Sequence, residues 1–310
     1  MSTAGVEQFT HPALLYRNDD EYLAGTVPYI RDGLAAGEPV AVAVPGPNLQ
    51  LIRDALGADA EHVLLRDMTV AGRNPGRIIP TVLLAFADAH PGRRVRLIGE
   101  PIWAGRSATE YPACAQHEAL INAAFTGRPA TILCPYNTEL LDPVWVEDAY
   151  RTHPVMLDAA SSFDSVHYDD PIAVAAGFNL PLPDPPADAA TITVDVHTLP
   201  AARRFIAEQA ARAELASERV GDLVLAVNEL AANAAEHGGG TGELAVWTED
   251  DSLVCQLADR GQLSDPLAGR IPVSADVSGG RGLLLVNQLC DLVRVHTTPA
   301  GTTIRVYLHH

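Results

Sequence analysis

The chain has 310 residues, of which 47% are hydrophobic, and its 39 acidic and 21 basic residues give a formal net charge of -18 at pH 7. This length is about twice that of a common domain, so two domains are expected. All 21 basic residues are arginines, and the absence of lysine excludes a P-loop nucleotide site and Schiff-base chemistry. The acidic balance disfavours direct binding to nucleic acid, which needs clustered basic residues.

Targeting and cysteine features predict a cytoplasmic protein without a membrane span. No apolar run of about 18 residues or more occurs, and the N-terminal sequence MSTAGVEQFT lacks the basic and apolar stretches of a signal peptide. The four cysteines are scattered and contain no CxxC pair, so neither a disulfide framework nor a zinc or redox motif of that kind is predicted. We expect them to be buried as small hydrophobic side chains.

The first half of the chain alternates strand-like and helix-like runs. This alternation predicts an α/β domain over residues 1–178, with a mostly parallel sheet and helices on both faces. A Pro-rich stretch, residues 179–190, predicts an extended linker to a second domain. The strand-like runs are residues 13–16, 39–44, 62–65, 94–98 and 130–134, and the helix-like runs are residues 20–35, 47–56, 76–90 and 109–125.

Residues 191–310 follow a different order. A helix opened by Pro200 comes after the first strand, and a second helix is capped by Ser217 and ended by Gly238. The whole order predicts an antiparallel sheet with helices on one face, an α+β sandwich. The expected strands are residues 191–199, 242–249, 252–259, 292–298 and 302–308, the expected helices are residues 200–215, 217–238 and 281–291, and a loop covers residues 261–280.

The first candidate chemistry lies on the predicted helix 217–238. Glu229 and Asn233 are four residues apart, so they project from the same face one turn apart. An asparagine offers a neutral oxygen to Mg²⁺, and a carboxylate can orient or deprotonate an attacking hydroxyl. Taken alone, such a pair is more often the solvated face of an amphipathic helix.

Two further segments, LADRGQLSDP and SGGRGLLLVNQLCD, carry candidate ligand contacts. Asp259 comes at a strand end, where its carboxylate can accept a hydrogen bond from an adenine amino group, and Gly261 leaves room for a base. Gly279, Gly280 and Gly282 precede an apolar helix whose first backbone amides suit a phosphate. Each segment alone is also typical of an ordinary turn or of close packing.

Together and in this order, the three segments resemble the GHKL ATPases, which have the Bergerat fold. NELAANAAEHG resembles the N box, DRG the G1 box and GGRG the G2 box. Within this superfamily, residues 191–310 look like the anti-sigma-factor serine kinases. The chain departs from the G1 pattern in having Leu263 where a second glycine is usual, and the loop expected to form the ATP lid is short. The resemblance implies ATP and Mg²⁺ as cofactors, Glu229 as general base, Asn233 as Mg²⁺ ligand, Asp259 as adenine contact, Gly261 as floor of the base pocket, and Gly280, Arg281 and Gly282 as the phosphate-binding turn.

The first half resembles the MEDS sensory domain that actinobacterial regulators place before an anti-sigma-like ATPase domain. The resemblance covers residues 8–160 and is based on FTHPALLYRNDDEYLAGTVPYIRDGLAAGEPV, GEPIWAGRS, HEALIN and LCPYNT. It implies that the domain senses a signal, which we expect to be a small molecule. We expect one group of residues after predicted strands to gather at the carboxyl edge of the sheet, where ligands usually bind. These residues are Glu100, Trp103, Arg106, Tyr136 and Asn137.

Histidine and cysteine residues of the first half suggest a metal site only weakly. The spacing of His11, Cys114 and His117 fits no standard site, so structural roles are expected for them.

The two resemblances imply a regulator that holds a sigma factor and phosphorylates a STAS-type antagonist on serine, under the control of the first domain. A non-catalytic nucleotide-dependent binding module and a sensor histidine kinase are the alternatives. A histidine kinase needs a phosphoacceptor histidine on a two-helix hairpin before its ATPase domain, whereas here the linker leads directly into a strand. Neither nucleic acid nor a membrane is an expected partner, and monomer and homodimer both stay open.

Overall fold

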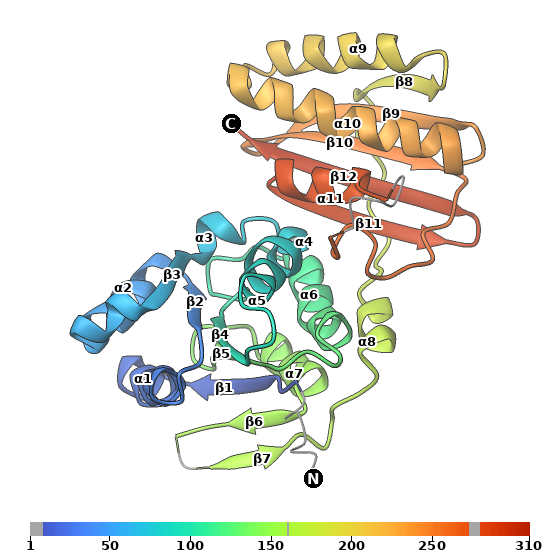
Figure 1. Cartoon of the computed structure of the whole chain (residues 1–310). Helices are drawn as coiled ribbons and strands as arrows, with labels where there is room; N and C mark the ends of the chain where they lie inside the picture. The colour runs from blue at the N-terminus through green and yellow to red at the C-terminus, as the bar shows by residue number, and fades with distance from the viewer. Residues whose placement is uncertain (1–8, 160, 273–279) are drawn as a thin grey trace. The chain divides into compact units, whose positions relative to one another are not determined.

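The computed structural model describes residues 9–159, 161–272 and 280–310, which form two compact units. The first unit holds the residues before 179, except Asn74–Arg77, which group with the second unit, Asn179–His310. Each unit has its own sheet, with seven strands in the first and five in the second (Figure 1).

The sheet of the first unit is parallel except at one edge, as predicted. Its strand order is β3-β2-β4-β5-β1-β6-β7, and only β6 and β7 pair in antiparallel fashion. Strand β2 is a fully buried run, VAVAV, which is typical of strands covered on both faces. The strands are β1 Pro12–Tyr16, β2 Val40–Val44, β3 Val63–Asp67, β4 Val95–Gly99, β5 Ala130–Asn137, β6 Val155–Leu157 and β7 Ser162–Asp164.

Helices cover both faces of this sheet, as predicted (Figure 1). Helices α1 and α2 pack on the face that carries Leu14, Val42 and Ile98, and α6 and α7 lie on the opposite face. The predicted helix 76–90 is interrupted by a π-helical turn that contains Pro80, because proline has no N–H for the α-helical hydrogen bond. The helices are α1 Asp19–Ala35, α2 Gly46–Leu56, α3 Met68–Ala71, α4 Pro75–Ile78, α5 Ala85–Asp88, α6 Tyr111–Ala124, α7 Pro143–Thr152 and α8 Pro171–Gly177, with a 3-10 turn η1 Gly57–His62 and the π-helical turn η2 Ile79–Leu84.

The second unit is an antiparallel sheet with helices on one face, as predicted. Its strand order is β11-β12-β10-β9-β8, and all neighbouring strands are antiparallel. Helices α9, α10 and α11 form one layer over the sheet (Figure 1). The elements are β8 Ala190–Asp195, α9 Leu199–Arg212, α10 Ser217–His237, β9 Thr241–Glu249, β10 Ser252–Asp259, α11 Gly282–Leu289, β11 Leu292–Thr298 and β12 Gly301–His309.

Helix α10 carries an apolar stripe that packs on this sheet. Leu223, Val227 and Leu230 are buried in the core beneath it. The helix ends at Gly238 as predicted, but the prediction that Ser217 caps its start is wrong. Ser217 is the first helical residue, Ala216 holds the N-cap position, and no side chain makes a capping hydrogen bond there. The stability of α10 therefore comes from its apolar stripe rather than from an N-cap.

The Pro-rich segment between the last helix of the first unit and β8 has no helix or strand over residues 178–189. Its beginning is bound to the sheet of the second unit. The Asn179 side chain donates to the carbonyl of Thr297 at 2.7 Å and accepts from the Thr297 N–H at 3.0 Å. The Arg305 guanidinium donates to the carbonyl of Pro183. This part of the segment thus belongs physically to the C-terminal unit.

Candidate functional site

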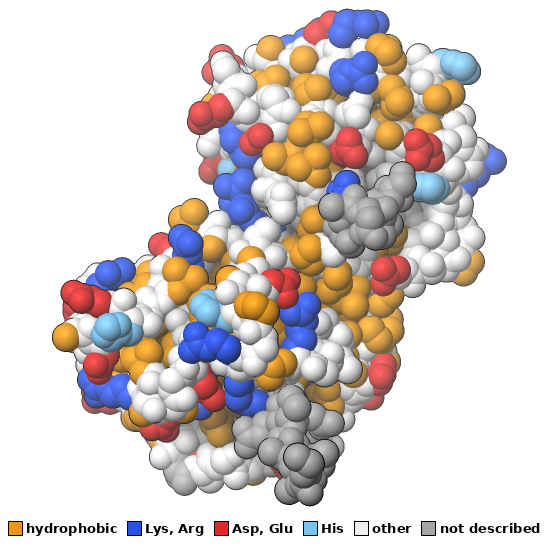
Figure 2. Space-filling model, viewed as in Figure 1, with side chains coloured by type: hydrophobic (Ala, Val, Ile, Leu, Met, Phe, Trp, Pro, Cys, Tyr) orange, Lys and Arg blue, Asp and Glu red, His pale blue; other side chains and the backbone are white. Residues whose placement is uncertain are grey.

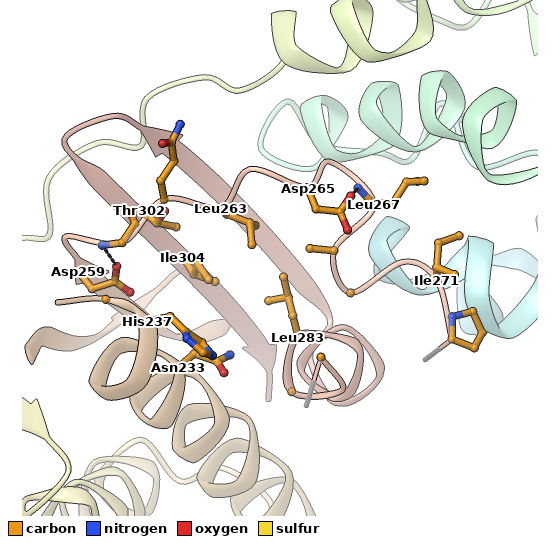
Figure 3. Close-up of a pocket in the computed structure, with 18 residues that line it drawn as sticks. Asn233, His237, Asp259, Leu263, Asp265, Leu267, Ile271, Leu283, Thr302 and Ile304 are labelled. Carbon is orange, nitrogen blue, oxygen red and sulfur yellow. Dashed lines mark hydrogen bonds between the residues drawn. The ribbon is translucent and has the colours of Figure 1, made fainter. Parts of the chain in front are cut away.

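A cavity of about 450 Å³ opens in the second unit beside α10, the β10–β12 pair and the start of α11 (Figure 3). This volume lies within the range of about 300–1,000 Å³ that is common for small-molecule sites. Its lining combines a few polar side chains and glycines with an apolar wall. The lining residues are Asn233, His237, Gly238, Asp259, Gly261, Gln262, Leu263, Asp265, Leu267, Ala268, Gly269, Ile271, Pro272, Gly280, Gly282, Leu283, Thr302 and Ile304.

Most of the residues expected at the nucleotide site meet at this cavity. Glu229 and Arg281 are not among its lining residues. Gly279 lies outside the described residues. Those that line the cavity are Asn233, Asp259, Gly261, Gly280 and Gly282.

Glu229 lies one turn before Asn233 on α10 and faces the start of α11. A methyl group built on Gly282 would come within 2.9 Å of a Glu229 carboxylate oxygen and 3.3 Å of the Asn233 amide nitrogen. Gly280 has a φ of 76°, a left-handed conformation that favours glycine. The two glycines therefore let the backbone before α11 pass close to the polar face of α10.

Asp259 ends β10 and directs its carboxylate toward the cavity (Figure 3). One carboxylate oxygen accepts the Gly261 N–H at 2.7 Å. Burial raises the pKa of Asp259, and the hydrogen bond from Gly261 offsets part of that rise. The described residues place no hydrogen bond on the second oxygen. That oxygen can therefore accept a hydrogen bond from a bound molecule.

Gly261 packs against the end of α10 with no space for a side chain. A Cβ at this position would lie 2.6 Å from the His237 carbonyl oxygen and 3.0 Å from Gly238 Cα. The neighbouring Arg260 N–H donates to the Gly238 carbonyl at 3.0 Å. Backbone contacts therefore set the position of the loop that follows Asp259.

The apolar wall of the cavity and Thr302 were not predicted from the sequence. Thr302 lies opposite Asp259 in the β10–β12 register and donates from its hydroxyl to the Gly261 carbonyl at 2.8 Å. Leu263, at the position where the G1 pattern usually has a second glycine, lies on the apolar wall. Apart from Leu263, no motif marks these residues, and the sequence shows only that they belong to β12, to α11 or to the segment after β10.

In the first unit, Glu100 follows β4 and has a buried carboxylate. It accepts hydrogen bonds from the hydroxyls of Tyr16 at 3.0 Å and Tyr22 at 3.3 Å, and from the Asn48 amide at 2.9 Å. Burial raises the pKa of Glu100 to about 7, and the three hydrogen bonds limit the rise. Burial and a raised pKa make Glu100 a candidate functional carboxylate.

The other residues expected beside Glu100 have local structural partners. The Arg106 guanidinium lies 3.8 Å from the ring centroid of Trp103 and donates to the carbonyls of Gly72 and Pro101. Tyr136 is buried with its ring edge-on to that of His153. Asn137 accepts the N–H groups of Glu139 and Leu140, at 3.0 and 3.1 Å. Arg106, Tyr136 and Asn137 therefore each have partners within the first unit.

The surface gives no single charged face in the view of Figure 2, where arginine side chains are interspersed with acidic and apolar ones. Among the residues that the structure describes, no helix is long and apolar enough to cross a bilayer.

Two family models match the chain. The MEDS model, described as the methanogen/methylotroph DcmR sensory domain, matches residues 10–154, and the model of the histidine kinase-like ATPase domain matches residues 192–308. A crystal structure of the RsbU and RsbW domains of Rv1364c from Mycobacterium tuberculosis is 23% identical, with 41% of this chain and 33% of that chain covered and a TM-score of 0.31. No curated protein matches the chain. The chain thus combines a MEDS sensory domain with a histidine kinase-like ATPase domain that follows it.

Proposed function

We propose that the C-terminal domain binds Mg-ATP, and that the chain is an anti-sigma regulator that holds a sigma factor and phosphorylates a STAS-type antagonist on serine. The observation that carries the proposal is the meeting of Asn233, Asp259 and the Gly280–Gly282 turn around one cavity of a histidine kinase-like ATPase domain. The MEDS domain would make this activity depend on a small-molecule signal.

The base-binding end of the cavity would be formed by Asp259, Gly261 and the apolar wall. The second Asp259 oxygen would accept a hydrogen bond from the exocyclic amine of adenine. Gly261 would form the floor of the base pocket, because its backbone lines the cavity and packs directly on the end of α10. Leu263 and Ile304 supply apolar surface for the faces of a planar base.

The phosphate-binding end fits a magnesium-bound triphosphate. The first backbone amides of α11 suit phosphate oxygens, and the Asn233 side-chain oxygen is a neutral ligand of the kind that Mg²⁺ accepts. A methyl group at Gly282 would crowd both Asn233 and Glu229, so the glycine keeps open the space between these side chains and the start of α11. Mg²⁺, when bound, would neutralise phosphate charge. Glu229, one turn from Asn233, would accept the proton of the attacking serine hydroxyl.

Two variants separate nucleotide binding from phosphoryl transfer. Asn233→Ala removes a ligand, so it should weaken Mg-ATP binding strongly in calorimetry. Glu229→Gln should still bind Mg-ATP and the sigma factor but lose phosphorylation of the antagonist by about a hundredfold or more. Matched controls on the same helix are Asn228→Ala, which removes a partner of Arg203, and Glu236→Gln, which changes an exposed carboxylate. Unchanged Mg-ATP affinity in Asn233→Ala would contradict the assignment.

The position of Leu263 favours one alternative, a nucleotide-dependent binding module without kinase activity. A side chain there occupies wall space that a second glycine would leave free. Wild-type protein that binds Mg-ATP and its protein partner but never phosphorylates a STAS-type antagonist would establish this alternative.

A sensor histidine kinase is disfavoured by the segment before β8. Residues 178–189 contain no helix, so no two-helix phosphoacceptor hairpin directly precedes the ATPase domain. Acid-labile self-labelling of the purified chain with ATP would bring this alternative back.

A further inference from the structure

Four side chains that can bind a metal meet inside the MEDS domain. They come from the residue before β1, from α6, from β5 and from the C-cap of α7, so the sequence spacing does not reveal them. One ligand atom from each lies within 4.8 Å of all the others, and all four residues are buried. The residues are His11, Glu118, Cys134 and His153. His11 thus groups with partners other than Cys114 and His117, beside which the sequence analysis considered it.

Three distances within this cluster match those between the ligand atoms of a tetrahedral ion. Nε2 of His11 and Nε2 of His153 each lie 3.3 Å from Oε2 of Glu118. Nε2 of His11 also lies 3.3 Å from Sγ of Cys134. Bonds of about 2.0–2.3 Å to a tetrahedral Zn²⁺ place neighbouring ligand atoms about 3.3–3.6 Å apart. The other pairs of ligand atoms lie within 4.8 Å of one another, so the side chains need to move inward only modestly to bind an ion at their centre.

The Nδ1 atom of each imidazole has a hydrogen-bond partner outside the cluster. Nδ1 of His11 lies 3.3 Å from the Asn122 side-chain oxygen, and Nδ1 of His153 lies 2.9 Å from the Ala149 carbonyl oxygen. The Asn122 amide nitrogen donates to the Thr152 carbonyl at 2.8 Å, which keeps the amide oxygen toward His11. With the protons on Nδ1, both Nε2 atoms turn a lone pair toward the cluster, as in metal-binding histidines.

Three polar atoms at the centre of the cluster have no hydrogen-bond partner among the described residues. They are the two Glu118 carboxylate oxygens and Nε2 of His153, and all three are buried. A buried carboxylate facing imidazole lone pairs is unfavourable unless a cation lies between them.

We infer that His11, Glu118, Cys134 and His153 bind one divalent transition metal, and the mixed nitrogen, oxygen and sulfur donors fit Zn²⁺. Four protein ligands close the coordination sphere, which is typical of a structural site rather than a catalytic one. The ion would connect β1, β5, α6 and α7, so metal binding and the folding of the MEDS domain are coupled. This inference does not depend on the nucleotide site.

The test uses the full-length protein after treatment with a chelator. Titration with Zn²⁺ should show one ion per chain and raise the melting temperature of the MEDS domain. Titration with Co²⁺ should give the absorption of tetrahedral cobalt with a cobalt–thiolate charge-transfer band. Cys134→Ser should remove that band, and Asn122→Leu should keep the band but lower the affinity about 10- to 100-fold. Cys114→Ser is the matched control, because it removes a buried thiol outside the cluster.

Glu118→Gln adds a test that depends on the direction in which the melting temperature changes. If the site binds Zn²⁺, this variant should melt below the Zn²⁺-loaded wild type, because it loses a ligand. If no ion binds, the variant should melt above the wild type with and without Zn²⁺, because a buried charge has been removed. The second result would overturn the inference. So would a chelator-treated protein that binds neither metal, or metal binding that Cys134→Ser leaves unchanged.

Discussion

The backbone packing of Gly261 on the end of α10 makes a quantitative prediction. In Gly261→Ala the new Cβ would lie 2.6 Å from the His237 carbonyl oxygen, whereas ordinary contact begins at 3.4 Å. The obstructing atoms belong to the backbone, so no side-chain rotation relieves the contact. The loop must instead move by about 0.8 Å, the difference between these two distances, away from α10. That movement pulls the Gly261 N–H from the Asp259 carboxylate, which it now meets at 2.7 Å.

The magnitude follows from the cost of overpacking, about 1–3 kcal/mol. Because the displaced loop forms one side of the cavity, Mg-ATP affinity should fall by about 5- to 150-fold if the whole cost appears in binding. Calorimetry measures the affinity, and thermal unfolding of the same protein measures any part that appears as lost stability.

Gly221→Ala is the matched control for this experiment. Gly221 is an exposed residue of α10, and a Cβ there would meet no atom within 4 Å. This variant should keep its Mg-ATP affinity and gain about 0.5–1 kcal/mol of stability, because alanine replaces a helical glycine. If Gly261→Ala binds Mg-ATP and melts like the wild type while the control behaves as expected, the reasoning from close backbone packing is refuted.

Two further predictions concern Gly282 and Glu100. Gly282→Ala would place a methyl group against the flexible Glu229 side chain, so antagonist phosphorylation should fall more than Mg-ATP affinity, as parallel kinase assays and calorimetry would show. Equal losses of antagonist phosphorylation and of Mg-ATP affinity would contradict the prediction for Gly282. For Glu100, whose pKa rises from 4.5 to about 7 by burial, the folded domain keeps a proton that the unfolded chain releases across that range. Stability should therefore fall by about 3 kcal/mol as the pH rises from 4.5 through 7, and Glu100→Gln should abolish that fall. Denaturant unfolding at several pH values measures this fall in stability. An equal fall with pH in Glu100→Gln would be inconsistent with a buried, titrating Glu100.

Much of the architecture follows from the sequence alone. The alternation of buried runs with amphipathic stretches predicts the parallel sheet and its helices, and the different order after residue 190 predicts the antiparallel sheet. These predictions are confirmed because each depends on local periodicity, which the longer strands and most of the longer helices carry. The short elements β6, β7, α3 and α8 were not predicted, because so few residues show too little periodicity to distinguish them from loops. The ten-residue helix α7 was not predicted either.

Motif order also identified the C-terminal ATPase domain, because GHKL contacts come from a few short segments with characteristic residues. The register that places Thr302 opposite Asp259, the close packing of Gly261 and the apolar wall with Leu263 depend on strand pairing and loop packing. The cluster of His11, Glu118, Cys134 and His153 is the clearest case. Its members are spread over nearly the whole length of the MEDS domain. They meet because parallel strands are joined by long crossovers, which bring residues together that are distant along the chain. The sequence by itself therefore determined the local elements and the contiguous motifs. Only the tertiary structure decided which separate side chains meet, because such contacts depend on the packing of whole elements rather than on spacing along the chain.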